Sequence, residues 1–137
     1  VKIYPSTLNI EIKKTKFLAI TKKNGIDYLV ASNGNLIKKS DISLKLPYIF
    51  GDIDVDNFLF FKEIIDISDF EFNKIKSLYY FKSNRWDIIT KEGLLLKIPI
   101  NLTVKKLNLI FEIIQKNNFN DVKTIDFRQN NMMVINE

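Results

Sequence analysis

The chain has 137 residues, a net charge of +5 and 46% hydrophobic residues, and it contains neither cysteine nor histidine. These two absences exclude disulfides, thiolate nucleophiles, Cys/His zinc sites and every catalytic arrangement that needs an imidazole. The length and composition predict one folded domain, or one domain with a fragment of another, and no apolar run approaches the ~20 residues of a membrane-spanning helix.

Lysine carries almost all of the positive charge, because Arg85 and Arg128 are the only arginines in the sequence. The lysines are spread along the chain with no run longer than two, and isoleucine and asparagine are also abundant. This pattern is more typical of a biased genome composition than of a nucleic-acid interface, which gathers its cations on one surface. We therefore expect no nucleic-acid partner. The alternative prediction is a basic module that binds nucleic acid or an anionic membrane surface.

The first part of the chain has the pattern of short strands separated by turns. Asn24-Gly25 is a strong hairpin signal because both residue types tolerate a positive φ, and residues 32–35 form a second turn. Four segments show the alternating or short apolar pattern of strands: residues 7–12, 17–20, 26–31 and 36–37. Tight turns join antiparallel neighbours, so this part predicts an antiparallel sheet.

The segment 42–50 is mostly apolar but contains Pro47, whose nitrogen cannot donate to a ladder. We therefore expect an edge strand or an irregular connector there. A helix is expected to begin at Asp54 or Asp56 and to run to about Asp66, with carboxylates that cap it rather than form an acid–base or metal site. Three apolar residues of this helix share the face expected to pack on the sheet: Phe58, Phe61 and Ile65.

The second part of the chain repeats this alternation of strands and a helix. The clearest hairpin has Gly93 in its turn, and the following helix begins near Val104 and ends at Asn117-Asn118. The expected strands cover residues 75–81, 85–90, 94–98, 122–128 and 132–135. Together the elements predict an α+β fold: a largely antiparallel, curved, multi-stranded sheet with two helices packed on one face.

Three features in the second part of the chain invite a functional interpretation. Trp86, beside Arg85, is expected to be a core aromatic, with an interface anchor as the alternative. Asp126 and Arg128 share one strand face and form an ion pair or bind a neighbouring chain. The terminal strand 132–135 is apolar on both faces, so it is either internal to the sheet or receives a strand from a partner.

Five short motifs follow one another along the chain. They are Pro5 to Ile10, Val30 to Gly34, Leu46 to Gly51, Arg85 to Ile88 with Gly93 and Leu96 to Pro99, and Ile125 to Arg128. In order and spacing they resemble the FtsQ/DivIB family of bacterial cell-division proteins, and the resemblance covers nearly the whole chain.

The resemblance implies a non-enzymatic scaffold of the divisome that has no cofactor and binds FtsB and FtsL. Residues 1–13 would be the last strand of an upstream POTRA domain and residues 14–137 an FtsQ-type β-domain. The segment would lie on the periplasmic side of the inner membrane at the septum, with its membrane helix upstream. An outer-membrane assembly chaperone of the POTRA type stays as an alternative.

The same resemblance implies where the partner binds. Members of the family hold FtsB at the last strands of the β-domain by strand addition, which agrees with the apolar terminal strand. The implied partner-binding residues are Arg85, Arg128, Gln129, Asn130, Asn131, Met132, Met133 and Val134.

Overall fold

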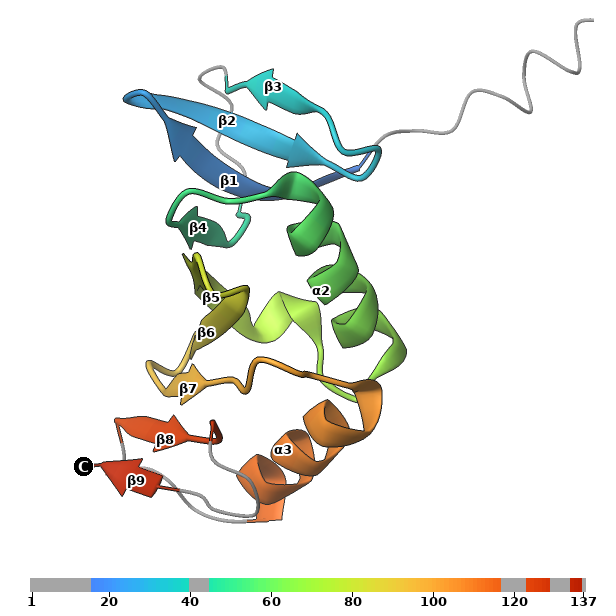
Figure 1. Ribbon diagram of the computed structural model, residues 1–137, viewed down its shortest axis with the longest axis vertical. Coiled ribbons are helices and arrows are strands. Elements are labelled where there is room, and N and C mark those ends of the chain that lie inside the picture. The colour runs from blue at the N-terminus through green and yellow to red at the C-terminus, as the bar shows by residue number, and fades with distance from the viewer. Residues whose placement is uncertain (1–15, 40–44, 117–122, 129–133, 137) are drawn as a thin grey trace, which may run out of the picture.

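The computed structural model describes residues 16–39, 45–116, 123–128 and 134–136. In these ranges nine strands form one sheet in the order β3-β2-β1-β4-β5-β6-β7-β8-β9 (Figure 1). The strands are β1 (Phe17–Lys23), β2 (Ile26–Ala31), β3 (Leu36–Lys38), β4 (Tyr48–Phe50), β5 (Ile75–Phe81), β6 (Arg85–Thr90), β7 (Leu95–Lys97), β8 (Thr124–Asp126) and β9 (Val134–Asn136). The helices are α2 (Val55–Ile67), the short 3-10 helix η1 (Phe72–Lys74) and α3 (Val104–Lys116).

The pairing of the strands follows the lengths of their connections. Hairpins join β1 to β2, β2 to β3, β5 to β6 and β6 to β7, and these pairs are antiparallel, as is β8 with β9. The chain passes through α2 between β4 and β5 and through α3 between β7 and β8, and those two pairs are parallel, as is β1 with β4. A parallel pair needs a crossover, which a helix supplies. The predicted α+β fold is confirmed.

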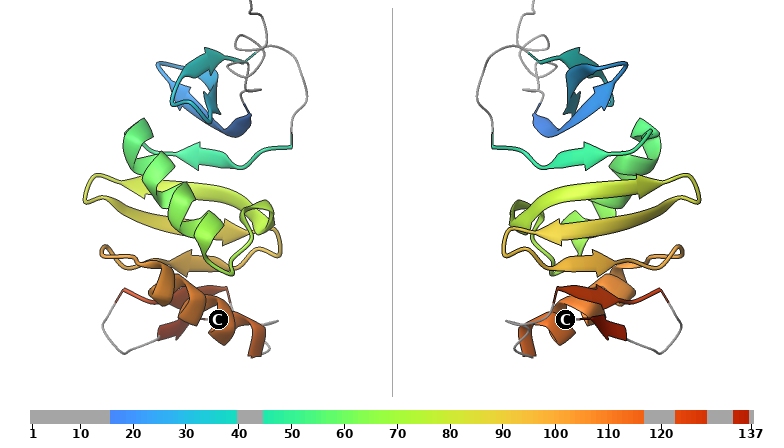
Figure 2. Two further views of the ribbon diagram at one scale, coloured as in Figure 1. Left: turned by 90° about the vertical axis from the view of Figure 1, so that its right-hand side faces the viewer. Right: turned by 90° about the vertical axis from the view of Figure 1, so that its left-hand side faces the viewer.

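Both helices cover the same face of the sheet, as predicted. The two views of Figure 2 show α2 and α3 in front of the sheet from one side and behind it from the other. Apolar residues from both layers meet between them in one buried cluster. Among its fully buried side chains are Phe58, Ile65, Leu78, Ile88, Leu96, Leu107 and Ile125.

Strand β4 corrects the expectation drawn from Pro47. It lies in the middle of the sheet between β1 and β5, so the predicted edge position is wrong for residues 48–50. Pro47 is compatible with this position because it precedes the strand and contributes an acceptor: its carbonyl receives the N–H of Ile20 at 3.0 Å. A proline is tolerated at the entrance of a strand, where no ladder donor is lost.

The helix α2 begins where the sequence predicts. Asp54 is its N-cap, and the carboxylate accepts the backbone N–H of Asp56 at 3.0 Å. Such a cap satisfies one of the donors that the first turn leaves unpaired. Of the two residues expected to begin the helix, Asp54 is therefore the capping one.

Trp86 is a core residue, as expected. It is 5% exposed, its ring stacks on Phe61 with 4.9 Å between the centroids, and Phe58 and Tyr80 lie within 6.0 Å and 4.8 Å of it. The alternative of an exposed interface anchor is thereby wrong. Three expectations lie outside the described residues: the strand at residues 7–12, the first two residues of the terminal strand 132–135, and the domain boundary after residue 13.

Candidate functional site

Strand β9 is the last strand of the sheet, and β3 is at the opposite end. It pairs antiparallel with β8, with Val134 opposite Asp126 and Asn136 opposite Thr124. An edge strand has one side of its backbone free to pair with another chain. The direction in which each backbone group of β9 points therefore decides what a partner would meet.

The hydrogen bonds between β7 and β8 set the direction of the groups in β8. The N–H of Leu95 donates to the carbonyl of Lys123, and the N–H of Phe127 donates to the carbonyl of Lys97, both at 2.9 Å. The odd-numbered residues of this segment thus face β7. Because backbone groups alternate along a strand, the even-numbered residues of β8 face β9.

The same alternation then fixes the groups of β9. Thr124 and Asp126 face β9, so their register partners Asn136 and Val134 face β8. Ile135, between them, turns its N–H and C=O away from β8, toward the side of β9 on which the described residues place no further strand. We call this the free side of β9. The edge therefore offers a donor and an acceptor at Ile135.

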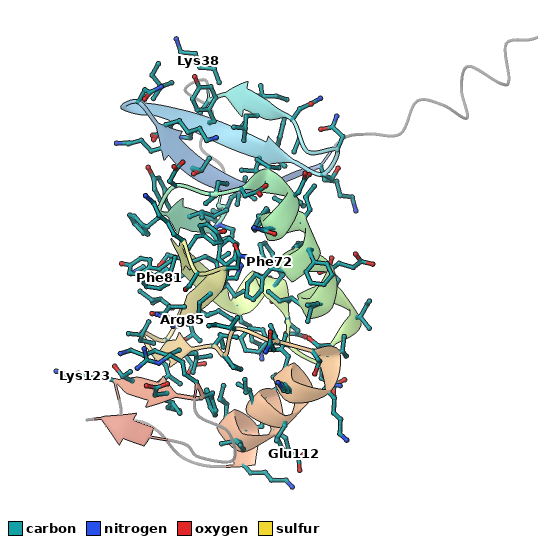
Figure 3. All side chains as sticks on the ribbon, in the orientation of Figure 1. Lys38, Phe72, Phe81, Arg85, Glu112 and Lys123 are labelled. Carbon is teal, nitrogen blue, oxygen red and sulfur yellow. The ribbon has the colours of Figure 1, made fainter. Side chains whose placement is uncertain are left out.

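Arg85 begins β6 and is held by two contacts. Its guanidinium forms an ion pair with Asp87 and lies over the ring of Phe81, 4.2 Å from the centroid. Figure 3 shows the labelled side chains of Phe81 and Arg85 next to each other. The Arg85 side chain is 13% exposed and that of Asp87 is 6% exposed. Burial raises the pKa of Asp87, and the charges of Arg85, Lys97 and Arg128 oppose that rise.

Arg128 follows β8 and pairs with Asp126 two residues earlier. Its Nε lies 2.9 Å and 3.0 Å from the two carboxylate oxygens, and its Nη2 lies 2.5 Å from Oδ2. These hydrogen bonds hold the pKa of Asp126 below its ordinary value. The expected ion pair on this strand face is confirmed, while the Arg128 side chain stays 43% exposed.

The two arginines line one pocket, which lies where β6 begins and where β7 and β8 end. Its volume is about 430 Å³, and it is lined by Ser83, Arg85, Pro99, Ile100, Asn101, Lys106 and Arg128. The register places Asp87, Lys97 and Asp126 in one row across the three strands. The cations of this region are Arg85, Lys97, Lys106 and Arg128, and its carboxylates are Asp87 and Asp126, so positive charge is in excess there. We call this the cationic pocket.

The structure brings together Arg85 and Arg128, which are far apart in the sequence, and it places Val134 at the start of the edge strand. The other five expected contact residues, 129–133, lie outside the described residues. Sequence reasoning missed Lys106 of α3 and Asn101, because neither the helical period nor a motif marks a residue that faces a distant strand end.

Two broad features of the described residues bear on function. They include no group of three or more acidic side chains that could hold a metal ion. Within the same ranges, no helix has the length and apolar character needed to cross a bilayer.

The comparisons with known proteins concern the family and the fold. Residues 19–128 match the family model described as "Cell division protein FtsQ/DivIB, C-terminal". A solved structure of the major extracytoplasmic domain of the cell-division protein DivIB from Geobacillus stearothermophilus is similar, with a TM-score of 0.51 at 14% sequence identity. That similarity covers 77% of this chain and 98% of the other. No curated protein sequence matches this chain.

Proposed function

We propose, because this chain belongs to the FtsQ/DivIB family of cell-division proteins, that it binds a divisome partner by strand addition at β9. The family consists of non-enzymatic scaffolds of cell division, and the partners proposed for this chain are FtsB and, through it, FtsL. A scaffold of this kind needs a surface that pairs selectively and no reacting group.

The orientation of Ile135 is the observation that carries the proposal. Its N–H and C=O point to the free side of β9, where an added strand would accept and donate. Main-chain hydrogen bonds of this kind supply affinity that depends little on side chains. Side chains near the edge then supply specificity.

The cationic pocket is the proposed source of that specificity. Arg128 follows β8, the neighbour of the edge strand, and is partly exposed, and Arg85 lies deeper in the same pocket. Asp87 and Asp126 balance the two arginines, so the excess of positive charge comes from Lys97 and Lys106. A partner carboxylate beside the added strand would be attracted to this region. The contact would act mainly through association rate and choice of partner.

A proline at Ile135 tests strand addition. Ile135→Pro removes the outward donor, and its ring obstructs the approach of a partner backbone, while the two neighbours that pair with β8 keep their N–H groups. We expect the affinity for the extracytoplasmic part of the same organism's FtsB, measured by isothermal titration calorimetry, to fall at least about tenfold.

Lys38→Pro is the matched control at the other edge of the sheet. The N–H of Ala31 donates to the carbonyl of Asn35, and the N–H of Lys39 donates to the carbonyl of Asp27, so the odd-numbered residues of this segment face β2. Because backbone groups alternate, the N–H and C=O of Lys38 point away from β2. This variant should bind FtsB as the parent protein does. If Ile135→Pro also keeps full affinity while both variants remain folded by circular dichroism, strand addition at β9 is wrong.

The domain assignment and location are further parts of the proposal. Residues 1–13 would end a POTRA domain and residues 14–137 would form the β-domain, on the extracytoplasmic side at the septum. The similar domain of DivIB is described as extracytoplasmic, which supports this placement. A fluorescent fusion of the full-length protein that stays diffuse in dividing cells would contradict the septal location.

A further inference from the structure

A second cavity adjoins the cationic pocket and has a different character. Its volume is about 270 Å³, and it shares Pro99, Ile100 and Asn101 with its neighbour. Its remaining lining comes from α2, the start of β6 and the segment after β7: Asn57, Phe60, Phe61, Ile64, Asn84, Trp86, Ile98 and Leu102. We call it the apolar slot.

The walls of the apolar slot differ in exposure in a way that suggests an occupant. Phe61 and Trp86 are buried and form part of the core. Phe60 and Ile100, in contrast, are 65% and 57% exposed. Two large apolar side chains held open to water at a hollow are typical of a surface that a partner covers.

Two of the three asparagines that line the slot, Asn57 and Asn84, are already hydrogen-bonded through their side chains. Asn57 donates from Nδ2 to the hydroxyl of Tyr80 and to Oδ1 of Asn84, both at 3.1 Å, and the Tyr80 hydroxyl donates to the same Oδ1 at 2.6 Å. An incoming polar group would have to break this triangle of hydrogen bonds. The slot therefore favours an apolar side chain, and its volume is below the ~300–1,000 Å³ of pockets for drug-sized ligands.

We propose that the apolar slot receives a large apolar side chain from the same partner segment that adds to β9, so that one partner occupies the edge, the cationic pocket and the slot in turn. This inference rests on the proposed function. The three surfaces adjoin one another, which supports the inference. Arg128 follows β8, the neighbour of the edge strand, and lines the cationic pocket, which shares three residues with the slot.

The spacing of the sheet gives the partner's layout. From β9 to β6 the sheet crosses three inter-strand steps of ~4.8 Å, which an extended chain spans in about four or five residues. A carboxylate for the cationic pocket should thus lie between the strand-adding residues and the apolar anchor. The partner chemistry is an acidic residue within a few positions of a large apolar one.

Two serine substitutions at exposed positions test the slot, each with a control of equal exposure. Phe60→Ser is compared with Ile67→Ser, since both residues belong to α2 and both are 65% exposed. Ile100→Ser is compared with Leu109→Ser, at 57% each. Neither control residue lines the slot.

We expect Phe60→Ser and Ile100→Ser each to weaken binding of the extracytoplasmic part of FtsB at least about fivefold, and the two controls to leave it within about twofold. All four variants should keep the parent's circular dichroism and unfolding midpoint within a few degrees. Equal losses in variants and controls would overturn the inference, because the slot would then act no differently from any exposed apolar side chain.

The proline variant separates the failure of the slot from the failure of strand addition. If Ile135→Pro abolishes binding and the slot variants do not weaken it, the slot inference is wrong and strand addition stands. If the slot variants weaken binding and Ile135→Pro does not, strand addition is wrong. The claim that the slot binds the same segment that adds to β9 is then wrong as well. In a double-mutant cycle, one apolar residue of FtsB should lose its effect when Phe60 is already Ser, and the absence of any such residue would also overturn the inference.

Discussion

Gly51 carries the sharpest stability prediction that the fold allows. It follows β4, an internal strand of the sheet, with φ at +107°, a conformation that residues with a Cβ rarely adopt. A Cβ placed there would lie 2.4 Å from the backbone carbonyl oxygen of Tyr80 in β5. The substitution Gly51→Ala therefore requires both a strained backbone and a displacement of the neighbouring strand.

The magnitude follows from these two contributions. The positive φ costs about 1–3 kcal/mol, and the forced separation from a backbone atom costs on the order of a further 1–3 kcal/mol, as in overpacked cores. A loss of about 2–6 kcal/mol is a large share of the ~5–15 kcal/mol by which domains are stable. Gly25→Ala is the control, because its φ is +77° and no atom lies within 4 Å of the added Cβ.

Urea unfolding followed by far-ultraviolet circular dichroism measures both variants. Gly25→Ala should lose about 1–2 kcal/mol from its positive φ alone, and Gly51→Ala should lose clearly more. Equal losses would show that β4 and β5 separate freely at this point. That result would refute the close approach of Gly51 to the backbone of Tyr80 in β5.

Three other substitutions test the core, the ion pair and the helix cap. Trp86→Ala should lower the free energy of unfolding by about 3–5 kcal/mol, since the ring stacks on Phe61 inside the core, and a loss below about 1 kcal/mol would contradict that placement. Arg128→Ala should raise the pKa of Asp126 toward its ordinary 3.8 in a carboxyl NMR titration, and an unchanged pKa would contradict the pairing. Because the folded-state pKa of Asp126 is lowered, the pair stabilises the parent above pH 3.8, and this contribution disappears as the pH falls through that lowered pKa. Asp54→Ala should cost about 1 kcal/mol in thermal or urea unfolding through loss of the cap, and Asp54→Asn, which keeps an acceptor, should cost less.

Local features of the fold could be predicted from the sequence because they depend on neighbouring residues. Asn24 and Gly25 have φ values of 53° and 77°, as the hairpin signal requires. The apolar period after Val104 gives α3, whose buried residues are Leu107 and Ile110. In each case the chemistry that decides the structure lies within a few positions of the residue concerned.

The order of strands in the sheet could not be predicted in the same way. Pro47 indicated an edge strand or an irregular connector. Strand β4 is internal instead, because its parallel pairings with β1 and β5 depend on contacts between segments distant in sequence. No local pattern specifies them. The two parallel pairs bridged by helices depend likewise on how α2 and α3 pack across the sheet.

The residues of the candidate site also differ in whether the sequence could identify them. Arg85 and Arg128 could be named because motifs mark them, and the structure places both in one pocket. Lys106 could not be named, since a lysine in the first turn of an amphipathic helix looks like any solvated residue. The hollow beside Phe60 and Ile100 exists only after α2 and the segment following β7 have packed together.

Hydrogen exchange of the backbone amides tests the central claim most directly. The protein alone and in complex with the extracytoplasmic part of FtsB would be compared by hydrogen–deuterium exchange, which reports the opening of individual backbone hydrogen bonds. Strand addition predicts that the amide of Ile135 exchanges much more slowly in the complex, while the amide of Lys38 at the opposite edge is unchanged. Unchanged exchange at Ile135 in a saturated complex, or new protection at Lys38 instead, would contradict partner binding at β9.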